Sequence, residues 1–114
     1  MRFTQGIRVQ CSDPDSLMAL LADWDLGQSK SEIMGYIGTK LLADRDRPGD
    51  YMILAEFAEV DGDLTAAEEA QRNNQREATE RWAERLRALV DGEPDWIHFD
   101  ELYHTGITGN IRTG

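Results

Sequence analysis

The sequence has few of the residues that stabilise secreted proteins or bind polyanions. Its 114 residues include a single cysteine, Cys11, so no disulfide can form within the chain, and a lone thiol persists best in a reducing compartment. Only 12 lysines and arginines accompany 22 aspartates and glutamates, which gives a formal net charge of −10. Because this charge repels phosphate backbones and anionic lipid surfaces, we expect neither nucleic acid nor a membrane as a partner. These features predict a cytoplasmic protein.

The sequence also lacks long apolar runs and a basic leader. Its first residues, MRFTQGIRVQ, alternate polar and apolar side chains, so we expect neither a signal peptide nor a membrane anchor. The length suits one domain with one core, and 40% of the residues are hydrophobic. Residues 105–114 include three glycines and few apolar residues. We therefore predict one domain over residues 1–104 and a C-terminal arm or flexible tail over residues 105–114.

The first part of the chain predicts a strand followed by a helix. Residues 3–11 alternate with a period of two, typical of a half-buried strand whose inward apolar side chains are Phe3, Ile7, Val9 and Cys11. Ser12-Asp13-Pro14 predicts a helix start, because a capping side chain precedes a proline suited to the first turn. The helix is expected to end near Gly27, and its apolar side chains at helical spacing are Leu17, Leu20, Leu21 and Trp24.

A hairpin is predicted in the middle of the chain and a strand at its end. Residues 32–43 and 50–59 are rich in apolar strand formers and flank the turn signal Pro48-Gly49. Alternation in the first of these strands places one set of apolar side chains on each side: Ile33, Ile37 and Leu41 on one, and Met34, Tyr36 and Leu42 on the other. After Pro94, residues 95–103 alternate as a last strand, with Trp96, His98, Asp100 and Leu102 on one side.

A second helical region is predicted between the hairpin and the last strand. Thr65 and Glu68 match the pattern in which each side chain caps the backbone of the other. Asparagine favours caps and turns over helix interiors, so the sequence leaves open whether Asn73-Asn74 interrupts the helix, and Asn74 with Glu77 offers a second such box. The longer piece covers about residues 75–90, with its inward side chains at Ala78, Trp82, Leu86, Leu89 and Val90.

The order of these elements, β-α-β-β-α-β, predicts an α+β fold of the ferredoxin-like kind. Such a fold has a four-stranded antiparallel sheet with two helices on one face. In residues 51–58, however, the second face carries Met52, Leu54 and Ala58, with Glu56 as its one polar residue. Two apolar faces predict that a second copy covers the sheet, so we expect a homodimer. The alternative is a monomer whose C-terminal arm folds over the sheet.

Three stretches of the sequence resemble the dimeric α/β-barrel superfamily. They are the opening MRFTQGI, the hairpin ADRDRPGDYMILAEF and the end ERWAERLRALVDGEPDWIHFDEL, and the likeness covers roughly residues 1–103. The chain is most similar to actinobacterial members grouped with antibiotic-biosynthesis monooxygenases and stress-responsive barrels. The resemblance implies a barrel closed by two sheets and a cleft between each sheet and its helices. Members use this cleft for cofactor-free oxygenation of phenolic polyketides, haem degradation, isomerisation or ligand binding.

Within that resemblance, five residues are candidates for the site. His98 and Asn74 are the candidate catalytic residues, since histidine exchanges protons near neutral pH and an amide can hold an oxyanion. The candidates for binding a substrate are Trp24, Tyr36 and Trp82. We predict a cofactor-independent monooxygenase-like enzyme that acts on a small aromatic metabolite, with no cofactor. The alternative is a non-catalytic dimer that binds a small ligand or responds to stress. In that protein Asn74 would cap a helix and the aromatic residues would pack in the core without contacting a substrate.

Metal binding is not expected from this sequence. His98, Asp100 and His104 share strand parity, but the sequence offers no third well-placed ligand, and His104 falls near or past the end of the predicted strand. The second helical region contains no histidine that could bind haem.

Overall fold

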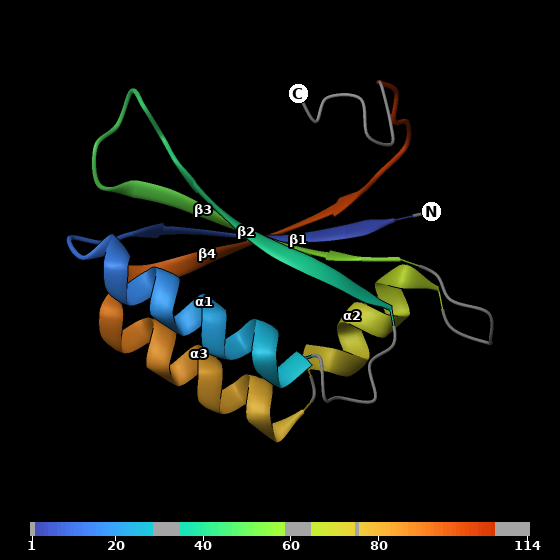
Figure 1. The fold of residues 1–114 in the computed structure, drawn as a ribbon, viewed down its shortest axis with the longest axis horizontal. Coiled ribbons are helices and arrows are strands. Elements are labelled where there is room, and N and C mark those ends of the chain that lie inside the picture. The colour runs from blue at the N-terminus through green and yellow to red at the C-terminus, as the bar shows by residue number, and fades with distance from the viewer. Residues whose placement is uncertain (1, 29–34, 59–64, 75, 107–114) are drawn as a thin grey trace.

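The computed structural model describes residues 2–28, 35–58, 65–74 and 76–106. Its elements in chain order are β1 (Phe3–Gln10), α1 (Pro14–Gln28), β2 (Tyr36–Ala43), β3 (Asp50–Phe57), α2 (Ala66–Asn74), α3 (Glu77–Leu89) and β4 (Asp91–Asp100). The strands form one antiparallel sheet in the order β2-β3-β1-β4 (Figure 1). This architecture confirms the predicted ferredoxin-like fold.

The helices cover one face of the sheet, which we call the helix-side face. Figure 1 shows α1 and α3 next to each other across this face, and α2 further along it. The main core lies between these helices and the sheet, and its fully buried residues include Leu17, Leu20, Ile53 and Leu86. A second cluster joins α2 to the sheet through Phe3, Phe57, Ala66 and Ala70. The predicted inward positions of β1 and of residues 51–57 are confirmed by their burial.

The starts of α1 and α2 follow the predicted capping patterns. The Ser16 hydroxyl donates to Asp13 Oδ2 at 2.6 Å and the Ser16 backbone N–H donates to Asp13 Oδ1 at 3.3 Å, and these two hydrogen bonds lower the pKa of the Asp13 carboxyl. At α2 the Thr65 N–H donates to Glu68 Oε1 at 2.9 Å, and the Glu68 N–H donates back to Thr65 Oγ1 at 3.1 Å. The capping box predicted at Thr65 is therefore confirmed.

The helical region is broken after Asn74, which answers the question that the sequence leaves open, and the second capping box, with Asn74 as the cap of the next helix, is wrong. α2 ends at Asn74 and α3 begins at Glu77. The N-cap of α3 is Arg76, in an extended conformation and without a side-chain capping bond. Its carbonyl accepts the N–H groups of Thr79 and Glu80 at 3.0 and 3.1 Å, so the backbone itself closes the first turn. Ala78, predicted to point inward, is exposed.

The last strand begins and ends earlier than predicted. β4 starts at Asp91 and includes Pro94, which an edge strand tolerates where the pairing with β1 is irregular. It ends at Asp100, and the two apolar residues after it, Leu102 and Tyr103, are 85% and 82% exposed. The predicted 95–103 strand is therefore too long at its end, because residues 102–103 have no partner strand in the described sheet.

A register shift in β2 changes the predicted orientation of Tyr36. Tyr36 pairs with Phe57 and Gly38 pairs with Glu56, so one extra residue lies between them. Tyr36 consequently lies on the helix-side face with Leu41, whereas strict alternation placed it with Leu42. The predictions for residues 33 and 34 lie outside the described residues.

The opposite face of the sheet, which we call the outer face, is apolar at its centre. It carries Met52, Leu54, Ile97 and Phe99, and none of the described helices covers it (Figure 1). Met52, Leu54 and Phe99 close over Gly6, where an added Cβ would lie 3.3 Å from both Met52 Sδ and Phe99 Cε2. Phe99 nevertheless remains 47% exposed. The described part of the chain therefore leaves part of this apolar surface exposed to solvent.

Candidate functional site

A small cavity lies between the helix-side face and the two long helices. Its wall contains the chain's three tryptophans, Trp24, Trp82 and Trp96, together with the polar residues Gln5, Thr39 and Thr79. We call it the inner cavity. Its volume of about 20 Å³ has room for roughly one water molecule. The side chains between the two layers therefore leave little empty space.

A larger open groove adjoins the inner cavity between α3 and β4. This α3–β4 groove has a volume of about 520 Å³, and His98 is among its lining residues. It shares Gln5, Thr79 and Trp96 with the wall of the inner cavity. These three residues therefore separate an open groove, large enough for a small ligand, from the inner cavity.

Two polar residues at this boundary were not predicted as site residues. Thr79 Oγ1 is buried, and it has no hydrogen-bond partner among the described residues. Gln5 is only 6% exposed, although it is polar. The sequence does indicate that both side chains point inward. Gln5 has the inward parity of β1, and Thr79 lies three positions before Trp82, on the same side of α3. A polar residue on an apolar stripe is the feature that could have identified both.

His98 lies at the groove as its strand parity suggests. It pairs with Gln5 across β1 and β4, on the same face as Trp96, and its side chain is exposed. Its ring stacks on Phe3 with centroids 6.0 Å apart and planes 30° apart. The histidine is therefore oriented by an aromatic contact while one side of the ring stays open to the groove.

Trp24 and Trp82 form a pair between α1 and α3. Their ring centroids lie 5.0 Å apart, and the Trp82 Nε1–H donates to the carbonyl of Leu20 at 3.3 Å. Trp82 is 7% exposed, so it is also a core residue. The hydrogen bond and the buried position fix the indole that forms one wall of the inner cavity.

The ring of Tyr36 packs against Trp24, one member of the tryptophan pair. Its ring meets Trp24 edge-on with centroids 6.3 Å apart, and Tyr36 is not among the residues lining the inner cavity or the groove. Its hydroxyl donates to Asp25 Oδ1 at 2.9 Å and lies 2.7 Å from Thr39 Oγ1. Burial, reinforced by the Asp25 carboxylate, raises the pKa of Tyr36 to about 12.

The raised pKa of Tyr36 predicts a loss of stability at high pH. The folded protein holds the phenolic proton more tightly than the unfolded chain, so the free energy of unfolding should fall as the pH rises from 10.0 to about 12. Urea unfolding followed across this range should show that the Tyr36→Phe variant loses less stability than the wild type. Equal losses in both proteins would contradict the assignment of the shift to Tyr36.

The remaining candidates lie at the edge of what the structure describes. Asn74 is the last residue of α2, its side chain lies outside the described part, and its catalytic role stays a prediction. His98 and Asp100 belong to β4, whereas His104 follows it. Within residues 2–28, 35–58, 65–74 and 76–106, no three His, Cys, Asp or Glu side chains are grouped to hold a metal ion. No described helix is long and apolar enough to cross a membrane.

Solved structures of several small microbial proteins share this architecture. SnoaB, a cofactor-independent oxygenase from Streptomyces nogalater, matches with a TM-score of 0.67 and 18% identity over 90% of this chain and 95% of its own. Rv0793 from Mycobacterium tuberculosis matches with a TM-score of 0.67 and 10% identity over 93% of this chain and 100% of its own. A protein from Deinococcus radiodurans, provisionally assigned as an antibiotic biosynthesis monooxygenase, matches with a TM-score of 0.65 and 14% identity over 96% and 100%.

These identities are low, so the likeness concerns the fold. A comparison with protein-family models gives no match, and neither does a comparison with curated proteins. The structural matches nevertheless cover nearly the whole of both chains in each case. The chain therefore has the ferredoxin-like fold of the cofactor-independent oxygenase SnoaB and of antibiotic biosynthesis monooxygenase-like proteins, as the resemblance in its sequence implied.

Proposed function

We propose that the protein is a cofactor-independent monooxygenase-like enzyme that oxidises a small aromatic metabolite in the α3–β4 groove. The observation that carries the proposal is the Thr79 hydroxyl, which is buried at the boundary between the groove and the tryptophan-lined cavity and has no hydrogen-bond partner among the described residues. A buried hydroxyl without a partner costs free energy, so it is a feature to be explained, and a bound ligand that accepts its hydrogen bond explains it.

The chemistry of such a reaction matches the groups along the groove. A base removes a proton from the substrate, and the resulting anion transfers electrons to O₂. A carbon–oxygen bond forms to give a peroxide, which loses water to leave a ketone, so one O₂ supplies both the new carbonyl oxygen and the water. His98 accepts the proton in this scheme, and the Thr79 hydroxyl donates a hydrogen bond to the substrate oxyanion.

The protein acts as a homodimer in this proposal. The outer face carries Leu54 and Phe99 at the side of the sheet opposite the helices, and an exposed apolar patch of this kind is commonly covered by a second copy. Pairing through the outer face leaves the α3–β4 groove free, because the groove lies on the helix-side face. Each protomer would therefore keep its own site.

Oxygen uptake with an anthrone-like phenolic substrate tests the enzyme proposal. His98→Ala is expected to lower kcat/KM by about a hundredfold or more, because a positioned base contributes about that much. His104→Ala is the matched control, since it removes the chain's other histidine at an exposed position after β4, and it should leave the rate unchanged. Equal rates for the wild type and His98→Ala would remove His98 from the mechanism.

A second variant separates catalysis from stability. Thr79→Val removes the unpartnered hydroxyl while keeping the shape of the side chain, so the free energy of unfolding should not fall. The oxygenation rate should fall nonetheless.

The alternative is a non-catalytic protein that binds a small ligand, and the small volume of the inner cavity favours it. That protein would bind phenolic compounds in the groove without consuming oxygen.

A further inference from the structure

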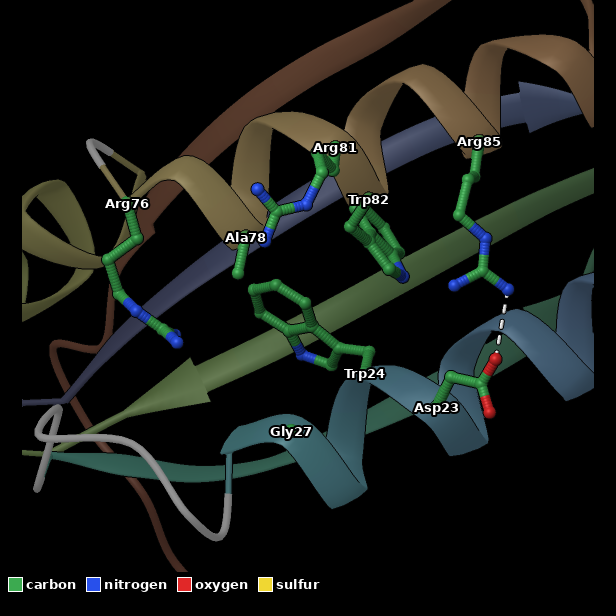
Figure 2. Close-up of a pocket in the computed structure, with 8 residues that line it drawn as sticks. All are labelled: Asp23, Trp24, Gly27, Arg76, Ala78, Arg81, Trp82 and Arg85. Atoms are coloured by element: carbon green, nitrogen blue, oxygen red, sulfur yellow. Dashed lines mark hydrogen bonds and ion pairs between the residues drawn. The ribbon is translucent and has the colours of Figure 1, made fainter.

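A hollow on the outside of the helix layer combines two indoles with three arginines. It lies between α1 and α3 and has a volume of about 240 Å³ (Figure 2). Trp24 and Trp82 line it, and the arginines around it are Arg76, Arg81 and Arg85. We call it the arginine hollow. The arginine hollow is separate from the α3–β4 groove and shares none of the residues that line it, among them Gln5, Trp96 and His98.

The positive charge of this hollow contrasts with the rest of the molecule. Three arginines and one acidic residue, Asp23, line it, in a chain whose formal net charge is −10. The N-terminus of α3 also faces the hollow through Ala78 and presents the positive end of the helix dipole, although Glu77 and Glu80 lie in the same first turn. An anion would therefore be attracted to this hollow in preference to the acidic surface around it.

The ion pairs that Arg81 and Arg85 make at the hollow are weak, so they would not prevent a ligand from binding these arginines. Arg81 contacts Glu77 at 2.8 Å and Arg85 contacts Asp23 at 2.9 Å, and more than half of each of these four side chains is exposed. Exposed ion pairs contribute little free energy, so a ligand can replace or share them at small cost. Figure 2 shows Arg76 on one side of the Trp24 ring and Arg85 on the other. A ligand seated on the indole is thus within reach of guanidinium groups from two directions.

We propose that the arginine hollow binds the carboxylate of a one- or two-ring aromatic acid, with the ring stacked on Trp24 and the carboxylate on the arginines. A planar guanidinium matches a carboxylate through two parallel hydrogen bonds, and an indole face offers apolar area to an aromatic ring. The volume of about 240 Å³ suits a ligand of this size. The site does not depend on the oxygenase proposal, since it lies on the other side of the Trp24–Trp82 pair from the reaction groove.

The chain's three tryptophans allow the site to be identified directly. In a ¹⁵N-labelled protein, 1-naphthoate should shift the indole N–H signals of Trp24 and Trp82 and leave that of Trp96 unchanged, because Trp96 lines only the inner cavity and the groove. The signals are assigned with single Trp→Phe variants. Neutral 1-naphthalenemethanol should bind at least about tenfold more weakly, since it lacks the charge that the arginines recognise.

Two arginine variants on one helix complete the test. Arg81→Gln should weaken naphthoate binding by about tenfold, whereas Arg87→Gln removes the same charge from the side of α3 that lines the groove and should have little effect. Both arginines are exposed, so neither variant should unfold the protein. The proposal is overturned if Trp96 shifts first, if Arg87→Gln is the more harmful change, if the neutral analogue binds equally well, or if naphthoate does not bind at millimolar concentration.

Discussion

Replacement of Leu86 by alanine is expected to lower the free energy of unfolding by about 2–5 kcal/mol. Leu86 is 0% exposed and belongs to the main core with Leu17, Leu20, Ile53 and Trp82. Truncation removes the apolar contact and leaves a cavity that helices packed on a sheet can only partly close. A domain of this size has a total stability of about 5–15 kcal/mol, so the variant should approach the limit of folding. Urea unfolding measures the change.

The same substitution at Leu26 is the matched control. Leu26 lies on α1 and is 60% exposed, so Leu26→Ala should change the free energy of unfolding by less than about 0.5 kcal/mol. Leu86 also holds α3, the helix that carries Thr79 and Trp82, against the sheet. A loss of ligand binding in Leu86→Ala would therefore be structural. Similar losses of stability at Leu86 and Leu26 would contradict the position assigned to the core.

Replacement of Phe99 by aspartate is expected to convert the proposed dimer into a monomer that keeps its fold. Phe99 is 47% exposed in the single chain, so the monomer tolerates a polar residue there. In a symmetric dimer that pairs through the outer face, the substitution would bury two unpaired carboxylates. The dimer should dissociate at least about a hundredfold more readily, because an uncompensated buried charge costs several kcal/mol. Sedimentation velocity at micromolar concentrations measures the effect.

Met18 provides the control for this prediction. It lies on α1 and is 51% exposed, so it matches Phe99 in exposure but belongs to the helix layer. Met18→Asp should sediment as the wild type does. A wild-type protein that sediments as one subunit would contradict the proposed dimer. In that case the alternative of a C-terminal arm over the outer face would depend on residues 107–114, outside the described part.

The elements of the fold were predictable from local patterns in the sequence. Alternation in β1 and β3 identifies the buried side chains, and the box formed by Thr65 and Glu68 identifies the start of α2. These signals depend on neighbours within four residues, so no tertiary information is needed to read them. The ferredoxin-like topology then follows from the order of the elements.

The errors in the prediction arise where tertiary contacts override local pattern. The register shift beside Tyr36 depends on pairing with β3, which strict alternation in β2 does not include. The start of β4 at Asp91 depends on the partner strand β1, which accommodates Pro94 at an irregular pairing. The predicted capping role of Asn74 is wrong because the chain turns into α3 two residues later, at Arg76.

The candidate site was only partly predictable for a related reason. Trp24, Trp82 and His98 were identified by residue type, and they line the cavity or the groove. Gln5 and Thr79 have ordinary polar side chains whose significance appears only when their burial is known. Their roles, like those of His98 and Asn74, stay predictions until a ligand is observed.

A crystal structure with a hydroxylated anthraquinone, the product of anthrone oxygenation, tests the central claim most directly. The account predicts the ligand in the α3–β4 groove, with a ring against Trp96, an oxygen within hydrogen-bond distance of Thr79 Oγ1, and the His98 ring beside the reacting carbon. A ligand bound only on the outer face, or a groove that stays empty at saturating concentration, would contradict it.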